Sequence, residues 1–325
     1  MAISIDDIKK LRAMTGAGLA DVKKALTEAE GDFDKAKDLL RERGLAIAAK
    51  RSDRETSNGC VLVKKEGKFA AIIALKCETD FVALTQSILD AAVAAQCKTL
   101  DEVKELTLAD GQKVAEAVTQ RSGITGEKME LDGYMTLEGE NIEGYDHMGK
   151  HTLCTLVQTN KENQEAGHKV AMQVAAMKPV ALNDKEMPQS ILDEEYKVAV
   201  EKTKEEQVER QVVNALKKAG INPNLVDSDD HIASNISKGY ITAEEGEKAK
   251  AIRAEVAPQA AAALKQPMIE NIAKGRVQKF LKDNCLVDQE FQFGDGDKMT
   301  VAAWLKTQDK ELEVVAYRRF TLAAE

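Results

Sequence analysis

The chain is organised around Phe69-Ala70-Ala71-Ile72-Ile73-Ala74-Leu75 and the residues that follow at once, Lys76-Cys77-Glu78-Thr79-Asp80-Phe81-Val82-Ala83. The first run is apolar and rich in strand-forming residues, which predicts a buried strand. The second run is polar, and a helical pattern begins after it at about Leu84. Phe81 therefore stands between a strand and a helix, where it is either one more core aromatic or an aromatic displayed for a partner.

The composition limits the class of protein. A chain of 325 residues is long enough for two or three domains, and with only 4% aromatic residues its core depends on aliphatic and alanine-rich helices. The formal net charge is -9, whereas binding to nucleic acid needs clustered lysine and arginine. We therefore expect no direct nucleic-acid partner.

Several features predict a cytoplasmic protein with no membrane partner. The chain has five cysteines without a C-x-x-C pair, which is typical of reduced thiols. The segment Met1–Asp7 is too acidic and too short in apolar length for a signal peptide, and nothing approaches the roughly 18 apolar residues of a membrane span.

The amino-terminal region predicts a bundle of three helices. Ser4 and Asp7 form the S-x-x-D pattern of a capping box, and the first helix is expected to end near Thr15. Gly16-Ala17-Gly18 supplies a turn, a second apolar stripe follows, and a third helix is expected to stop at Gly44.

The middle of the chain contains two copies of one unit. Gly67-Lys68 followed by mostly apolar residues matches Gly149-Lys150 and its continuation, and an alanine-rich helix follows each copy. The first copy begins as a hairpin, and residues 97–132 between the copies are interpreted as helical. The repeat predicts two duplicated α+β subdomains that pack together.

A long charged helix is expected from Ser190 to about Lys218, and Thr242 opens an alanine-rich helix that Pro258 and Pro267 kink or interrupt. This pattern predicts an inserted, coiled-coil-like helical hairpin. The last alternating run, residues 312–320, predicts a final core strand. The fold class is therefore α+β. The predicted domains are a bundle at 1–45, a linker at 46–58, a first core subdomain at 59–140, a second at 141–189 and 268–325, and the hairpin at 190–267.

Two motifs resemble the translation elongation factor Ts family. They are the Thr79-Asp80-Phe81-Val82 tetrapeptide after a strand, and the run from Leu11 to Leu26, Leu-Arg-Ala-Met-Thr-Gly-Ala-Gly-Leu-Ala-Asp-Val-Lys-Lys-Ala-Leu. The resemblance spans nearly the whole chain and implies that the first helices form a bundle of the ubiquitin-associated type. It also implies guanine-nucleotide exchange in translation elongation.

The resemblance implies particular roles for residues. The partner is elongation factor Tu, both GDP-bound and nucleotide-free, and homo-oligomerisation through that complex is compatible with the family. Thr79, Asp80, Phe81 and Val82 would displace Mg²⁺ from the partner so that GDP leaves and GTP enters. The remaining contact residues implied are Arg12, Leu19 and Ala20 in the bundle and His147 in the second core subdomain.

Two other function classes stay open from the sequence. One is a binding or scaffold protein with a bundle of the ubiquitin-associated type and no exchange activity. The other is a nucleotide-using enzyme, based on Gly144–Thr152, which imitates a phosphate-binding loop but places His151 at the hydroxyl position and continues as a strand. His147, His151 and Cys154 would leave a zinc site incomplete. We expect no cofactor, no metal and no enzyme activity.

Overall fold

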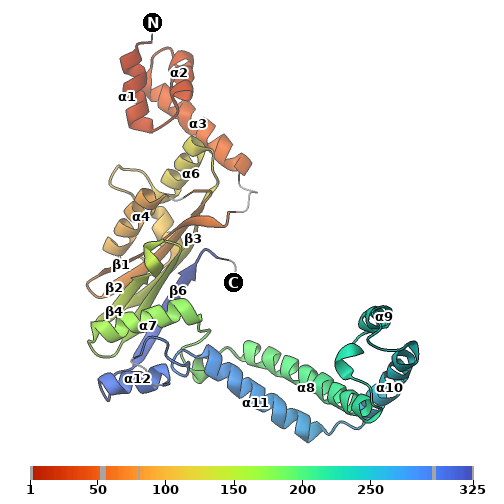
Figure 1. Cartoon of the computed structure of the whole chain (residues 1–325). Coiled ribbons are helices and arrows are strands. Elements are labelled where there is room, and N and C mark those ends of the chain that lie inside the picture. The colour runs from red at the N-terminus through yellow and green to blue at the C-terminus, as the bar shows by residue number, and fades with distance from the viewer. Residues whose placement is uncertain (1–2, 52–55, 80, 295–297, 324–325) are drawn as a thin grey trace. The chain divides into compact units, whose positions relative to one another are not determined.

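The computed structural model describes residues 3–51, 56–79, 81–294 and 298–323, and it mixes helices with two small antiparallel sheets (Figure 1). The chain forms two compact units, Met1–Leu182 with Glu290–Glu325 and Asn183–Gln289. The elements of the first unit are α1 (Ile5–Thr15), α2 (Leu19–Glu28), α3 (Phe33–Arg51), β1 (Asn58–Glu66), β2 (Phe69–Cys77), α4 (Val82–Ala94), α5 (Leu100–Glu105), α6 (Val114–Thr125), β3 (Met129–Glu138), β4 (Asn141–Asp146), η1 (His147–Gly149), β5 (Leu153–Thr159), α7 (Gln164–Met177), α12 (Val301–Gln308) and β6 (Val314–Thr321).

The first three helices form the bundle that the sequence predicts. Ser4 Oγ accepts from the Asp7 amide and the Asp7 carboxylate accepts from the Ser4 amide, so the capping box is confirmed. Gly16 ends α1 in the left-handed conformation, with φ 68°. A small apolar core joins the three helices: Leu11, Ala17, Val22, Ala25, Leu26, Ala29 and Ala36.

The predicted end of the third helix is wrong, because α3 continues past Gly44 to Arg51. The predicted linker at 46–58 therefore begins as helix, and its last residue, Asn58, already belongs to β1. Gly44 is buried against α6 and does not act as a helix stop.

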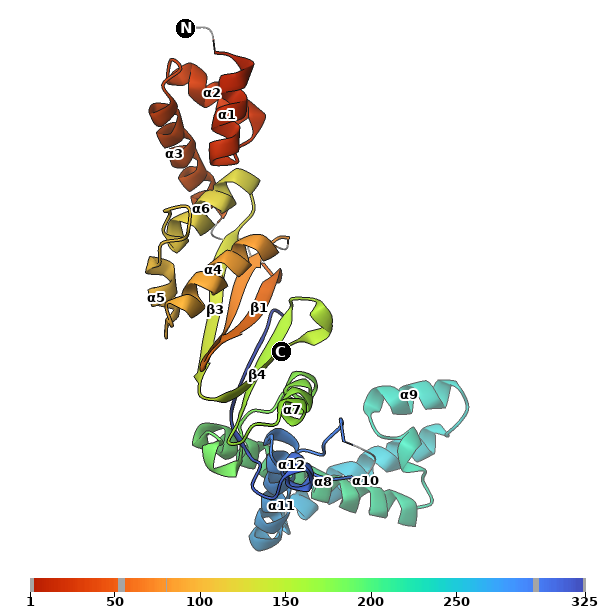
Figure 2. The ribbon, with the colours of Figure 1, turned by 90° about the vertical axis from the view of Figure 1, so that its left-hand side faces the viewer.

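The first sheet has the order β1-β2-β3. β2 is its central strand, and its two faces are both covered, which explains the unbroken apolar run. Ile73 and Leu75 face the helices, with α4 across β1 and β2 and α6 against β3 (Figure 2). Ile72 and Ala74 face the second sheet.

The second sheet has the order β4-β5-β6 and packs against the first through Val61, Ile142 and Leu156. Helix α7 covers its other face, where Thr155 Oγ1 donates to the Ala171 carbonyl at 3.0 Å. Each sheet thus has a central strand followed by a covering helix. The glycines that mark the two copies, Gly67 and Gly149, both adopt positive φ, of 58° and 64°, before the central strand.

Residues 97–132 are only partly helical, because α5 and α6 are followed by β3 from Met129. Val114, Ala117 and Val118 form the inner face of α6, as expected. Strand β3 alternates buried and exposed residues at its start, and it completes the first sheet beside β2.

The second unit contains η2 (Asp184–Glu186), α8 (Gln189–Lys218), η3 (Pro223–Leu225), α9 (Asp229–Ser237), α10 (Ala243–Ala262) and α11 (Gln266–Asn284). α8 packs against α10 and α11, so the unit extends beyond the predicted hairpin at 190–267. Residues 268–289 were expected in the second core subdomain and belong to this unit instead. A separate apolar core lies at one end of α8: Val212, Leu216, Ile221, Val226, Ile232, Ile241 and Ala249.

No helix in the described ranges combines the length and the apolar character needed to cross a bilayer. All five cysteines are buried. Burial raises the pKa of the Cys285 thiol to about 11.

Candidate functional site

The turn between β2 and α4 carries the tetrapeptide that the sequence singles out, and a carboxylate from another part of the chain holds it. Thr79 is exposed, its amide donates to Glu127 Oε2 at 3.0 Å, and its Oγ1 donates to Glu127 Oε1 at 3.1 Å and Oε2 at 3.0 Å. The Cys77 thiol donates to the Thr79 carbonyl. Asp80 lies outside the described residues.

Phe81 is half-buried at the start of α4 and packs against the core of the first sheet. Its backbone has φ -118° and ψ 61°, and its carbonyl accepts from the Thr85 amide at 3.0 Å and from Thr85 Oγ1 at 2.9 Å. Val82 is also half-buried against the same core. Phe81 therefore fits both the core and the display interpretation. It packs against the core, and part of its surface stays exposed.

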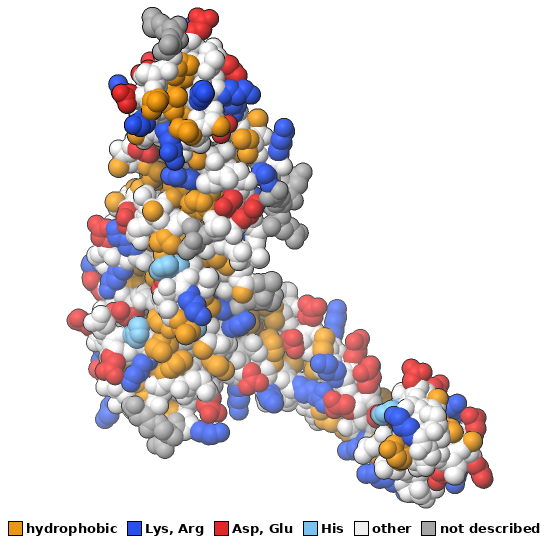
Figure 3. Space-filling model, turned by 45° about the horizontal axis from the view of Figure 1, so that its top comes forward, with side chains coloured by type: hydrophobic (Ala, Val, Ile, Leu, Met, Phe, Trp, Pro, Cys, Tyr) orange, Lys and Arg blue, Asp and Glu red, His pale blue; other side chains and the backbone are white. Residues whose placement is uncertain are grey.

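The bundle residues implied by the resemblance lie together on an exposed part of α1 and α2. Arg12 is in the last turn of α1, and Leu19 and Ala20 begin α2 after the glycine turn. All three are exposed, and Leu19 has 59% of its surface accessible. Met14 beside them is 55% accessible. Hydrophobic side chains (orange) thus reach the surface among basic ones (blue) at this end of the chain (Figure 3).

A groove of about 710 Å³ connects the bundle with the start of α4. Met14 and Gly16 line it from the first turn, and Ala83 and Leu84 line it from α4. The bundle turn and the helix that begins at Val82 are therefore neighbours, although they are far apart in sequence.

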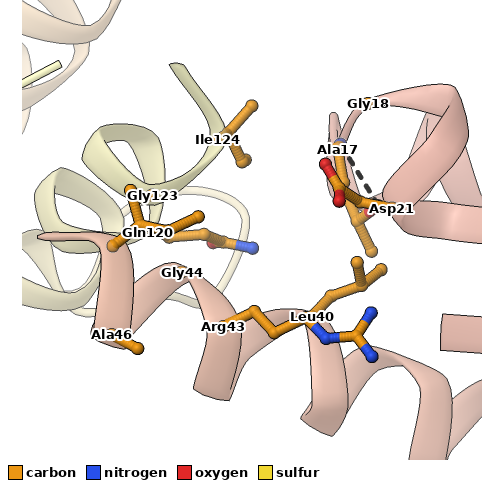
Figure 4. Close-up of a pocket in the computed structure, with 12 residues that line it drawn as sticks. Ala17, Gly18, Asp21, Leu40, Arg43, Gly44, Ala46, Gln120, Gly123 and Ile124 are labelled. Carbon is orange, nitrogen blue, oxygen red and sulfur yellow. Dashed lines mark hydrogen bonds between the residues drawn. The ribbon is translucent and has the colours of Figure 1, made fainter. Parts of the chain in front are cut away.

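A second groove, of about 230 Å³, lies where α3 crosses α6 (Figure 4). Ala17, Leu40 and Ile124 line it, and Gly44 and Gly123 meet beside it. A Cβ built on Gly123 would lie 2.6 Å from the Gly44 carbonyl oxygen, so the two helix backbones are in direct contact. This crossing joins the bundle to the core.

His147 lies apart from these residues, in the turn η1 that leads into β5. Its Nδ1 is 3.2 Å from the Tyr145 hydroxyl, and the Tyr145 ring makes edge contacts with both His147 and His168. The next residue, Met148, has φ 58° and is 70% accessible. The turn therefore holds an ordered imidazole beside an exposed thioether.

The geometry disfavours the phosphate-binding alternative. Strand β5 follows Gly149, whereas a phosphate-binding loop needs a helix amino terminus there. His151 precedes β5 with φ 55°, and its amide donates to Asp146 Oδ1 at 3.1 Å. Within the described ranges, no three His, Cys, Asp or Glu side chains are placed to hold a metal ion.

The sequence interpretation missed three residues at these sites: Glu127, Gly123 and Met148. Gly126-Glu127 after an apolar stripe signals only a helix end, since Thr79 and Glu127 are 48 positions apart in the sequence and no local pattern shows their pairing. A glycine within a helical pattern predicts the close packing of two helices only when the helix that it packs against is known. The exposed Met148 directly follows His147, so the sequence alone could have shown it as a neighbour of a candidate residue.

The chain is similar to known proteins along its whole length. The family model described as "Elongation factor TS" matches residues 76–222 and 214–324. The chain is 58% identical to elongation factor Ts of Parabacteroides distasonis and of Bacteroides fragilis, and 39% identical to that of Porphyromonas gingivalis, with full coverage of both chains in each case.

These matches define a class of protein, the translation elongation factors. Within that class, the chain belongs to the elongation factor Ts family.

Proposed function

We propose that this protein is a guanine-nucleotide exchange factor. It binds GDP-loaded elongation factor Tu, displaces Mg²⁺ and promotes GDP release so that GTP can bind. Family membership supports the partner, and the ordered turn that presents Thr79, Phe81 and Val82 supports the mode of action. The protein would act in the cytoplasm, where translation takes place. No covalent chemistry is required, so the function is that of a binding protein and not of an enzyme.

The bundle and the core have different parts in this proposal. Arg12, Leu19 and Ala20 form an exposed surface that would hold the partner. His147 would contact it from the second core sheet. Phe81 and its neighbours, Asp80 included, would enter the Mg²⁺ region. Binding of the factor and binding of nucleotide are then reciprocally coupled, because each weakens the other by the same factor.

The burial of Phe81 limits what its ring contributes. Transfer of a whole Phe side chain from water to an apolar site contributes roughly 1.5–3 kcal/mol. Because most of the Phe81 surface is already covered by the chain itself, at most about a third of that gain remains, ~0.5–1 kcal/mol, or about two- to fivefold in affinity. The rest of the exchange effect has to come from the surfaces that hold the partner.

The test is release of a fluorescent GDP analogue from elongation factor Tu, with catalytic amounts of this protein. We expect saturable acceleration, and Phe81→Ala should slow the saturated rate about two- to fivefold while the half-saturating concentration changes little. Tyr240→Ala is the matched control, since Tyr240 is an exposed aromatic of the second unit, 67% accessible.

The outcomes separate the proposal from the alternative. Tight binding of elongation factor Tu without faster GDP release would favour a binding or scaffold protein. Equal saturated rates for Phe81→Ala and wild type would exclude the role of the ring but leave exchange itself intact.

A further inference from the structure

The turn that presents Phe81 is fixed to a part of the chain that the proposed function does not use. Within the described residues, all hydrogen bonds recorded for the Glu127 carboxylate come from Thr79, through its amide at 3.0 Å and its hydroxyl at 3.0 and 3.1 Å. Hydrogen bonds to an ionised acceptor are shorter and stronger than neutral ones. The amide contact and the hydroxyl contact, which is shared between the two carboxylate oxygens, bring the main chain and the side chain of Thr79 to one carboxylate.

Glu127 is itself held rigidly. It follows Gly126, which ends α6 in the left-handed conformation with φ 72°. The buried Ser122 donates from Oγ to the Glu127 carbonyl at 2.5 Å, and the Glu127 amide donates to Thr125 Oγ1 at 3.3 Å. The carboxylate therefore extends from the short connection between α6 and β3, whose main chain is hydrogen-bonded to the last turn of α6.

The other side of Phe81 is fixed as well. The Phe81 carbonyl accepts two hydrogen bonds from Thr85, at 3.0 and 2.9 Å, and Thr85 is fully buried in α4. Thr79 and Phe81 are separated by a single residue, so main-chain anchors lie on both sides of the aromatic. A functional side chain keeps its direction only when the groups around it are themselves fixed.

We propose that Glu127 is a positioning residue for exchange, which holds Thr79 and so directs the Phe81 ring toward the partner. This inference rests on the proposed function and adds to it a residue outside the tetrapeptide. Glu127 does not touch the nucleotide or Mg²⁺ in this account. Its effect passes through the turn that it holds, and chiefly through Phe81.

Hydrogen exchange and nucleotide release together test the inference on the full-length chain. In Glu127→Ala, the Thr79 amide should exchange at least about tenfold faster, since it loses a hydrogen bond to a charged acceptor. The saturated rate of GDP release should fall roughly two- to fourfold, no more than the loss in Phe81→Ala, with the half-saturating concentration nearly unchanged. Glu127→Gln keeps one acceptor oxygen and should recover most of the rate.

The decisive comparison is a double-mutant cycle. If Glu127 acts through Phe81, adding Glu127→Ala to Phe81→Ala should change GDP release less than about twofold. Glu130→Ala is the control, because Glu130 lies three residues away and its carboxylate is 3.3 Å from Lys128 Nζ. It should leave both the Thr79 amide and the release rate unchanged.

Three results would overturn the inference. These are an unchanged Thr79 amide in Glu127→Ala, a release rate equal to wild type in that variant, or an equal fold-loss in the presence and absence of Phe81. If the wild-type chain fails to accelerate GDP release, the proposed function itself falls, and the inference falls with it. That outcome is distinguishable, because it appears before any variant is made.

Discussion

The close contact between α3 and α6 predicts different effects for alanine at Gly44 and at Gly123, two glycines that look equivalent in the sequence. A Cβ on Gly123 would lie 2.6 Å from the carbonyl oxygen of Gly44 and 2.7 Å from its carbonyl carbon. These are backbone atoms and cannot rotate away. A Cβ on Gly44 would instead lie 3.7 Å from the Gly123 Cα, which is ordinary van der Waals contact.

The two alanine variants should therefore have opposite effects. Gly123→Ala has to push the helices apart by about 1 Å, and overpacking of this kind costs about 1–3 kcal/mol. Gly44→Ala adds no clash and removes a glycine from a helix interior, which stabilises it by about 0.5–1 kcal/mol.

Amide hydrogen exchange on the full-length chain, followed by mass spectrometry of peptides from α3 and α6, measures both effects. Exchange should accelerate about five- to 150-fold in Gly123→Ala and slow about two- to fivefold in Gly44→Ala. If both variants shift exchange in the same direction, the backbone contact at this crossing is not as described, and the reasoning is refuted.

Three further predictions concern stability. Gly133→Ala should destabilise the first unit by about 1–3 kcal/mol in denaturant titrations. The reason is that the added Cβ would lie 2.6 Å from Cζ of Phe320 on the other sheet. Phe320→Leu in the same chain should recover part of the loss. Cys285, whose folded pKa is about 11 against 9.0 unfolded, contributes stability that is complete below pH 9 and is lost as the pH rises from 9 to 11. Cys285→Ala should therefore flatten that part of the curve of unfolding free energy against pH. Thr242→Ala removes the hydroxyl that accepts from the Glu245 amide at 3.1 Å and should cost about 1 kcal/mol, measured as faster amide exchange in α10.

Local signals in the sequence predicted much of the fold. The capping box at Ser4 is present as expected, and Thr242 opens α10 as expected. The apolar run of β2 is buried on both faces, and the repeated unit corresponds to two sheets that each have a covering helix. These features depend on residues a few positions apart, so their pattern is readable in one dimension.

The errors have a common cause in long-range contacts. Gly44 was interpreted as a helix stop because glycine is common there, but α3 uses it for close approach to α6. The strand β3 follows a helical pattern and is defined by its pairing with β2. At the site, the tetrapeptide was found, whereas its anchor Glu127 depends on a pairing that no local pattern encodes.

The order of strands in the second sheet has a consequence for synthesis of the chain. β5 is central in that sheet, yet its neighbour β6 is made only after residues 183–289. Until β6 emerges from the ribosome, β5 presents an unpaired edge, which is the form of a sheet most prone to pairing with other chains. The inserted unit has its own apolar core and needs no segment from elsewhere to complete it. The nascent chain would therefore complete the later unit before the earlier one.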